Sequence, residues 1–364
     1  MDPLMERLLD LAIEIQQIPA PTFHEEDRAD FIQECFHLEK ILSVEKDVAG
    51  NVLACLPGKG NAAPIVVSAH MDTVFPLDTN LHFTRSSDRV FGAGIGDNSL
   101  GLAGLFGLLW QLSKQKIKLS SDLWLAANVC EEGLGDLKGM QGLVDRFGKA
   151  PKAYLILEGM AFGHIYNRAL GVRRYRITIN TSGGHSWTDY GQASAVHELT
   201  RLASRLTSLP LPSSPRTTLN VGKIIGGTSV NTIAAQASLE LDLRSEGREA
   251  LQTVVLQVEQ LASSLENPDV HVQVDVIGQR PGGEISGDHP LVLQAKECLL
   301  EQGIQPVLTI GSTDANLPLS MGLPAITIGL TSGANAHTVH EYILTDPLPK
   351  GIDQMVNLVE KIGK

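Results

Sequence analysis

The chain has 364 residues, of which 43% are hydrophobic and only 5% aromatic, and it carries a formal net charge of −12 at pH 7. This length allows a substantial hydrophobic core and favours two domains over one. The acidic balance, with no basic cluster beyond GVRRYR at 171–176, argues against a nucleic-acid or anionic-membrane surface and favours small ligands as partners.

The N-terminal segment, MDPLMERLLDLAIEIQQIPAPT, predicts an amphipathic helix, because acidic residues interrupt its apolar pattern. It lacks the basic end and the uninterrupted apolar core of a signal peptide, and no segment of the sequence is long and apolar enough to span a bilayer. The cysteines form no C-x-x-C pair, which indicates reduced thiols rather than a disulfide framework or a zinc ribbon. They are Cys35, Cys55, Cys130 and Cys298. We therefore expect a cytoplasmic protein.

Residues 64–158 alternate short apolar runs with helical patterns, which is typical of a parallel sheet with crossover helices. The runs PIVVSA, DLWLAANV and AYLILE predict strands, and two helices are predicted over about 99–115 and 138–147. The first of these helices is apolar nearly all round, so it should be buried against the sheet. This segment predicts an α/β fold with a mostly parallel central sheet.

The pattern changes between residues 170 and 282, where the predicted elements follow the order β-α-β-β-α-β. The predicted strands are RRYRITIN, TTLNVGKIIGG, TIAAQASLELDLRS and VHVQVDVIG. This order is typical of a ferredoxin-like domain. Because α/β alternation resumes afterwards with PLVLQAKECLLEQG, PVLTI and PAITIGL, we predict a main domain of residues 1–169 and 283–364 that carries residues 170–282 as an insert.

Potential metal ligands occupy the ends of predicted strands or the loops that follow them. They are His70, Asp72, Asp97, Glu131, Glu132, Glu158 and His337. Because the carboxyl ends of strands in an open α/β sheet converge on one crevice, residues that are distant in sequence can meet there. Alternate side chains of a strand point to the same side, so His70 and Asp72 would project together. The pattern predicts a single site.

The charges of these residues favour bound cations. Carboxylates that share a crevice repel one another and become protonated unless a cation compensates them. The four acids Asp97, Glu131, Glu132 and Glu158 would be balanced by two divalent ions. Mixed imidazole and carboxylate ligands suit zinc, with cobalt or manganese as substitutes, whereas calcium takes oxygen ligands. The lack of thiolate ligands favours an open, catalytic site.

Taken together, the motifs AHMDTV, GIGDNSLG, EEGLGDLKG, LEG and HTVHEYI, interrupted by the predicted insert, resemble the dinuclear zinc exopeptidase family. That family includes peptidase T, carboxypeptidase G, aminoacylase, acetylornithine deacetylase and succinyl-diaminopimelate desuccinylase. The likeness covers essentially the whole chain, and the motifs occur in the family's order. It implies a zinc-exopeptidase-like catalytic domain with a ferredoxin-like lid and dimerisation domain inserted at 170–282.

The resemblance also implies the metal ligands. Asp97 would bridge two zinc ions, which cobalt or manganese could replace. His70 and Glu158 would complete the ligands of one ion, and Glu132 and His337 those of the other.

The residues around these ligands have implied roles as well. Asp72 would hold the ring of His70 in the right tautomer. Glu131 would be the general base that takes a proton from the attacking water and delivers it to the leaving nitrogen. The family also tends to have a cis peptide bond after the bridging aspartate, here Asp97–Asn98.

Three residues of the insert are functional candidates through the resemblance, although each also has a structural interpretation as a turn or strand-end residue. His185, in TSGGHSW, would stabilise the tetrahedral oxyanion and would reach the site from a partner subunit. Asn231 and Arg244 would hold the backbone or carboxylate of the substrate. Closure of the insert as a lid would bring these groups to the substrate and exclude water. A homodimer formed through the insert is expected from the family.

The predicted reaction is hydrolysis of a terminal amide bond in a small peptide, by an exopeptidase of the peptidase T or carboxypeptidase G type. Glu158 departs from the aspartate that is usual in the aminopeptidases, so an N-acyl-amino-acid deacylase stays open as an alternative. A Rossmann oxidoreductase is disfavoured because Asp97 replaces the third glycine of its fingerprint, and a serine hydrolase because Asp97 replaces the first glycine of the nucleophile elbow. A non-catalytic amino-acid binding protein is the remaining alternative.

Overall fold

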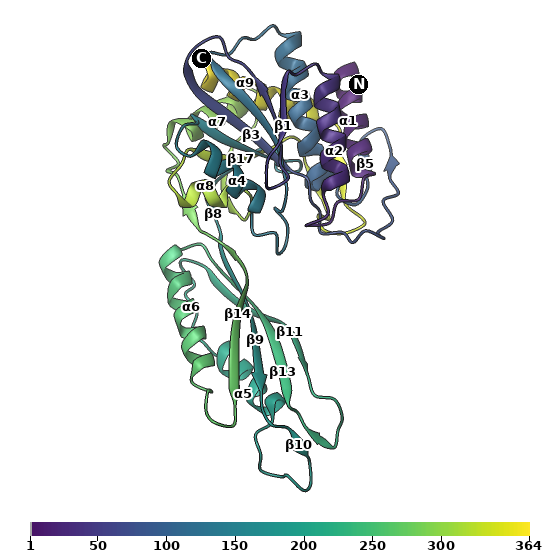
Figure 1. Cartoon of the computed structure of the whole chain (residues 1–364). Helices are drawn as coiled ribbons and strands as arrows, with labels where there is room; N and C mark the ends of the chain where they lie inside the picture. The colour runs from purple at the N-terminus through teal and green to yellow at the C-terminus, as the bar shows by residue number, and fades with distance from the viewer. Residues whose placement is uncertain (1) are drawn as a thin grey trace. The chain divides into compact units, whose positions relative to one another are not determined.

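The computed structural model describes residues 2–364, and Figure 1 shows the arrangement of the elements within each part of the chain. The chain divides into two compact units, Met1–Ala169 with Gly283–Lys364, and Leu170–Gly282. Each unit has a hydrophobic core of its own.

The first unit is built on a nine-stranded sheet with the order β1-β2-β6-β3-β7-β17-β8-β15, in which β16 also pairs with β8. The strands are β1 (Ser43–Lys46), β2 (Val52–Leu56), β3 (Ala62–His70), β6 (Ser121–Asn128), β7 (Ala153–Glu158), β8 (His164–Ala169), β15 (Gly283–Glu284), β16 (Val307–Gly311) and β17 (Ala325–Gly329). The central strands β6, β3, β7 and β17 are parallel, whereas β1, β2, β8 and β15 add antiparallel pairs towards the edges. The prediction of an α/β fold with a mostly parallel central sheet is confirmed.

Helices cover this sheet, and the most buried of them is the predicted apolar helix. The helical elements are α1 (Pro3–Gln16), α2 (Glu26–Leu38), the turn η1 (Ile95–Ser99), α3 (Leu100–Lys114), α4 (Lys138–Phe147), α7 (Pro290–Leu300), α8 (Asn316–Ser320) and α9 (Leu348–Gly363). Helix α3 packs against β3 and β7 and is flanked by α1 and α9, so almost all of its side chains are buried, as its composition predicts. Helix α1 buries its apolar face as the N-terminal pattern predicts.

A second, smaller sheet in this unit carries the segment that contains His337. Its order is β18-β19-β5-β4, and its strands are β4 (Thr84–Arg85), β5 (Arg89–Phe91), β18 (Gly333–Ala334) and β19 (Tyr342–Leu344). Each strand has only two or three residues, which is too short for a periodic apolar pattern to mark it. This sheet brings a loop near the C-terminus of the chain beside the segment that leads into η1.

The second unit has the element order β-α-β-β-α-β around an antiparallel four-stranded sheet, β11-β13-β9-β14. Its elements are β9 (Gly171–Asn180), β10 (Gly184–His185), α5 (Ala195–Thr207), β11 (Thr217–Gly226), β12 (Thr232–Ile233), β13 (Gln236–Ser245), α6 (Arg248–Ser263) and β14 (His271–Arg280). The segment 232–245, predicted as one strand, is divided here, because residues 232–233 pair with β10 and the strand proper begins at Gln236.

The two faces of this antiparallel sheet differ in polarity. Along β13, Leu239, Leu241 and Leu243 are buried in a core with α5 and α6. The alternate residues, including Glu240 and Asp242, lie on the open face and form ion pairs with arginines. This alternation is the expected pattern for a sheet with one solvated face.

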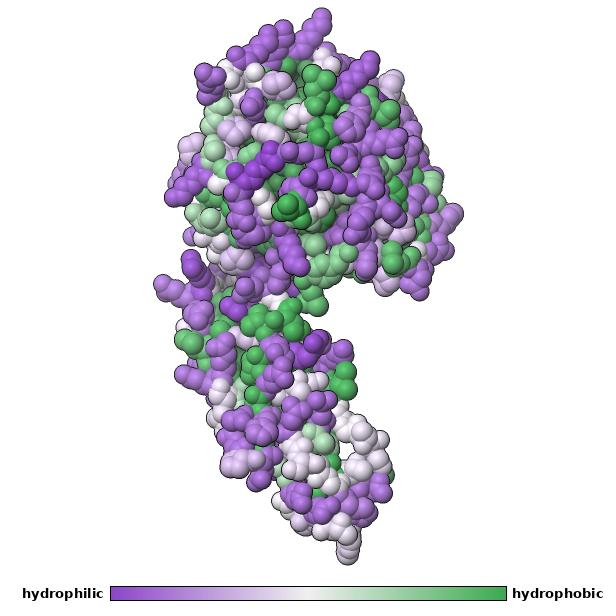
Figure 2. All heavy atoms as spheres, viewed as in Figure 1, coloured by the Kyte–Doolittle hydropathy of each residue, from purple (hydrophilic) through white to green (hydrophobic). Residues whose placement is uncertain are grey.

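The surface is largely polar. Hydrophilic side chains cover most of the visible face of the first unit, and hydrophobic ones appear there in scattered spots (Figure 2). None of the helices within residues 2–364 combines the length and the apolar character that a membrane span needs.

Candidate metal centre

The predicted metal ligands lie together at one edge of the central sheet. His70 is the last residue of β3 and Glu158 the last of β7, while Glu131 and Glu132 follow the end of β6. Because these three strands are parallel neighbours, their carboxyl ends meet at the same edge. Asp97 reaches this edge from the turn η1.

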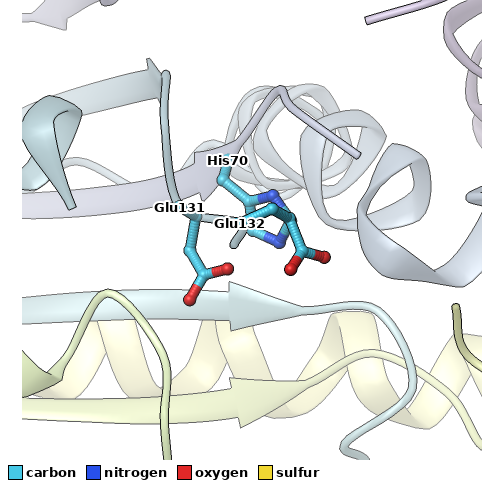
Figure 3. A group of neighbouring side chains, drawn as sticks. All are labelled: His70, Glu131 and Glu132. Carbon is cyan, nitrogen blue, oxygen red and sulfur yellow. The ribbon is translucent and has the colours of Figure 1, made fainter. Parts of the chain in front are cut away.

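Figure 3 shows three of these residues. The side chains of Glu131 and Glu132 lie beside the ring of His70, and their carboxylates point in different directions. Their ligand atoms lie within 4.8 Å of one another, as do those of two further groups. These further groups are His70, Asp97 and Glu158, and Asp97, Glu132 and His337. Asp97 is shared by both, so the arrangement divides naturally into two subsites around one aspartate.

The two carboxylate oxygens of Asp97 face different histidines. Its Oδ1 lies 3.1 Å from Nε2 of His70, and its Oδ2 lies 3.1 Å from Nε2 of His337. His70 Nε2 is 3.8 Å from Glu158 Oε2, whereas His337 Nε2 is 3.1 Å from Glu132 Oε1. A carboxylate with a histidine on each oxygen has the geometry of a bridging ligand.

The protonation of the cluster reflects its excess of negative charge. Burial lowers the pKa of His70, but contacts with Asp72, Asp97 and Glu158 outweigh it and raise that pKa well above its ordinary value. Contacts with Asp97 and Glu132 raise the pKa of His337 to about 10. Burial raises the pKa of Glu158 to about 7. Protons on the two imidazoles thus supply positive charge that divalent cations would supply instead.

The donor set fits a pair of divalent metals. Two imidazole nitrogens and carboxylate oxygens suit zinc, cobalt or manganese, and each subsite offers three protein ligands, one fewer than a closed structural zinc site has. His70 and Glu158 would hold one ion, Glu132 and His337 the other, and Asp97 both.

Asp72 contacts both segments that carry ligands. Its carboxylate accepts hydrogen bonds from the backbone N–H groups of Glu131 and Glu132, both at 2.8 Å, and from the hydroxyl of Thr22 at 2.9 Å. The Nδ1 of His70 lies closer to the carbonyl oxygen of Asp72, at 3.0 Å, than to its carboxylate, at 3.5 Å. In this geometry the main chain of residue 72 orients the imidazole, and its side chain fixes the turn of the two glutamates.

The loop of Asp97 is anchored to the end of β7. The Asp97–Asn98 peptide bond is cis, as the resemblance implies. The side chain of Asn98 donates to the carbonyl oxygen of Leu157 at 2.8 Å and accepts from the N–H of Gly159 at 3.2 Å. A Cβ on Gly159 would lie 2.2 Å from the carbonyl oxygen of Gly96, so only glycine allows this close approach.

Sequence reasoning missed residues that reach the centre from the N-terminal helices. Glu25 accepts a hydrogen bond from the N–H of Cys130 at 3.0 Å, directly before the two glutamates. Arg28, almost fully buried, donates to the carbonyl oxygens of Met71, at 2.7 Å, and of Ile18. Both side chains bond main-chain atoms of ligand-bearing segments, a type of contact that leaves no periodic signal in the sequence.

The three candidates of the insert do not lie together. His185 in β10 pairs with Thr232, and the N–H of Ser186 donates to the carbonyl oxygen of Asn231 at 3.0 Å, so His185 and Asn231 share one end of the unit. Arg244 pairs with Val172 at the other end of the sheet, beside the junctions with the first unit. The eight residue steps from Gln236 to Arg244 correspond to about 26 Å of strand.

Comparison with known proteins gives a consistent result. Residues 66–361 match the pattern of peptidase family M20/M25/M40. The succinyl-diaminopimelate desuccinylase of Corynebacterium glutamicum is 25% identical over 347 residues, 92% of this chain and 90% of that protein. Carboxypeptidase G2 of a Pseudomonas species is 24% identical over 87% of this chain and 78% of that protein. The crystal structure of a tripeptidase from Staphylococcus aureus has a TM-score of 0.83 at 22% identity and covers 99% of this chain and 98% of its own.

Proposed function

The chain belongs to peptidase family M20/M25/M40, and on that premise we propose that it is a two-metal exopeptidase that hydrolyses a terminal amide bond of small peptides. The observation that carries this proposal is Asp97, with a histidine on each of its carboxylate oxygens and an acidic residue beside each histidine. Zinc is the metal that this donor set favours, with cobalt or manganese as substitutes.

Glu131 is the residue we assign to proton transfer. When bound, a pair of divalent ions lowers the pKa of water towards about 7 and polarises the scissile carbonyl. Glu131 is almost fully buried at the edge of the cluster, and its N–H is held by Asp72. It takes the proton from the attacking water and delivers it to the leaving nitrogen. Its neighbour Glu132 faces His337 and holds metal, so the adjacent glutamates have separate tasks.

His185 is suited to stabilise the oxyanion. Its Nδ1 accepts a hydrogen bond from the N–H of Trp187 at 3.2 Å, which places the proton of the neutral imidazole on Nε2. Its own N–H donates to the carboxylate of Asp189 at 2.7 Å, which fixes the turn. Nε2 is then a donor for the developing charge on the substrate oxygen.

We assign the insert the roles of lid and dimerisation domain. Because Arg244 and the pair His185 and Asn231 lie at opposite ends of the sheet, one insert does not present all three to one small substrate. Two chains solve this problem if Arg244 binds the substrate of its own chain while His185 and Asn231 reach the partner's site. Trp187 and Tyr190, exposed by 84% and 91% beside His185, are the kind of aromatic residues that protein interfaces bury.

The alternative function is hydrolysis of an N-acyl amino acid. Glu158 in place of aspartate favours it, and one relative is named a succinyl-diaminopimelate desuccinylase. A non-catalytic amino-acid binder is the more distant alternative. We also propose a cytoplasmic location, where the thiols of the four cysteines would stay reduced.

One set of assays separates these functions. The protein, loaded with Zn²⁺ or Co²⁺, is tested on tripeptides, on N-acetyl amino acids and on peptides with a C-terminal glutamate. We expect turnover of peptides and about two metal ions per chain by elemental analysis. Turnover of the N-acetyl amino acids alone would establish the deacylase. If the protein binds no metal even when it is purified with metal supplied, the non-catalytic binder would be favoured.

A further inference from the structure

Glu341 is a buried carboxylate whose partners are all backbone N–H groups of the loop that leads to Asp97. Its Oε1 accepts from Gly96 at 2.6 Å and from Asp97 itself at 2.8 Å, and its Oε2 accepts from Gly94 at 3.2 Å. The residue is fully buried. Burying a carboxylate is costly unless hydrogen bonds satisfy it. Three N–H groups that donate to one side chain therefore indicate that this carboxylate has a specific structural role.

The same residue belongs to the loop of His337. Its N–H donates to the carbonyl oxygen of Thr338 at 3.1 Å, and its own carbonyl oxygen accepts from the N–H of Gly92 at 2.9 Å. Glu341 therefore joins two segments that are about 240 residues apart in the chain, one carrying Asp97 and the other His337. The Nε2 of His337 lies 3.1 Å from the Oδ2 of Asp97.

We propose that Glu341 is a positioning residue, which holds Asp97 and His337 at the separation that the second metal subsite, formed with Glu132, requires. This inference rests on the two-metal function proposed above. Glu341 belongs to none of the three ligand groups, so it acts on the metal through the residues that it holds. Such outer contacts commonly change metal affinity by about 10- to 100-fold.

The two histidines differ in how much support they have without Glu341. His70 ends the central strand β3, is fully buried, and has its segment fixed by Arg28 and Asp72. His337 is half exposed in a short loop, and its backbone has φ of +63°, a conformation that non-glycine residues adopt at a cost. Both subsites share Asp97, so loss of Glu341 should weaken both, but it should weaken the subsite of His337 more than that of His70.

The test is calorimetric titration of Zn²⁺ into the metal-free protein and its Glu341→Gln variant, which removes one acceptor while keeping the size of the side chain. We expect the wild type to bind two ions. The variant should bind the ion of the His337 subsite about 10- to 100-fold more weakly and the other ion with a smaller loss of affinity. The more strongly weakened ion should be the one that His337→Ala loses, and not the one that His70→Ala loses.

Asp122→Asn is the matched control. The carboxylate of Asp122 also accepts a backbone N–H, that of Gly58 at 2.7 Å, but it lies at the start of β6, and the metal residues follow the end of that strand. This variant should bind both ions as the wild type does. Glu341→Asp, which keeps the charge and withdraws it by one methylene, gives a second test should the glutamine variant not fold. If Glu341 is a positioning residue, Glu341→Asp should also bind the ion of the His337 subsite more weakly.

The possible results distinguish a failure of the role of Glu341 from a failure of the two-metal function. A wild type that binds fewer than two ions contradicts the two-metal proposal itself. A wild type with two ions, together with Glu341 variants that bind both at unchanged affinity, overturns the role of Glu341 alone. A variant that weakens both ions equally would also overturn it, because the segment of His70 has support of its own from Arg28 and Asp72.

Discussion

The two units of this protein differ in how their candidate functional residues are arranged. In the first unit, acids and imidazoles from five segments of the chain, that of Asp97 included, lie together, and half of them are buried. In the insert, His185 and Asn231 are exposed, Arg244 is half exposed, and about 26 Å of strand lies between the two ends. The first unit thus assembles a complete charged site from one chain, whereas the insert offers separate contacts that need a substrate or a second chain to unite them.

The sharpest test of the first unit is Glu131→Ala. We expect turnover to fall by about 10²- to 10⁴-fold, the usual contribution of a general base, because the attacking water loses its proton acceptor. Elemental analysis should still find two metal ions. Glu132→Ala is the matched control at the next position, and it should lose one of them. If Glu131→Ala were the variant that emptied the site, the roles of the two glutamates would be reversed.

Substitution of His185 tests the role of the insert, again through turnover and metal content. His185→Ala should lower kcat by about 10²- to 10³-fold, as the loss of an oxyanion donor does, and leave metal content unchanged. Mixing the inactive His185→Ala and Glu131→Ala chains should restore activity, because a mixed dimer has one intact metal site facing one intact insert. Mixtures that stay inactive after subunit exchange, checked by sedimentation, would place His185 in its own chain's site or outside the mechanism.

The grouping of the candidate metal ligands could be predicted because their positions follow from the sheet. His70, Glu132 and Glu158 stand at or just after the ends of parallel strands, which apolar runs mark in the sequence and which converge at one edge. Glu25 and Arg28 could not, because they bond main-chain atoms of distant segments and nothing in their own helix indicates it. The separation of Arg244 from His185 could not be predicted either, because it depends on strand register and not on the apolar pattern of the sequence.

A rise in pH should destabilise the metal-free first unit, because two of its glutamates hold protons in the folded state. Burial raises the pKa of Glu158 and of Glu341 to about 7, above the range of an unfolded glutamate. The folded protein therefore holds protons that the unfolded chain has already released. Their contribution to stability is present below about pH 4.5 and is lost as pH rises through 7.

We therefore expect the free energy of unfolding of the metal-free protein to fall by roughly 2 kcal/mol for each of these two glutamates between pH 5 and pH 7.5, measured with urea. Saturating Zn²⁺ should remove this dependence, since the cations stabilise the charged carboxylates. Glu158→Gln is the control, because it removes one of the two titrating groups. A metal-free protein whose stability rises over this range would contradict the assignment of these two buried acids.

The smallest effect should come from the open face of the insert. Glu240 accepts from Arg176 at 2.9 Å, but both side chains are partly exposed, and water screens such pairs. Glu240→Gln should change the free energy of unfolding by less than about 1 kcal/mol, and less still at high salt. Leu241→Ala, one position along the same strand, removes a side chain buried against α5 and α6 and should cost about 2–5 kcal/mol. Equal effects of the two substitutions would mean that the charged face is covered in solution, as it would be if the second chain of a dimer packed there.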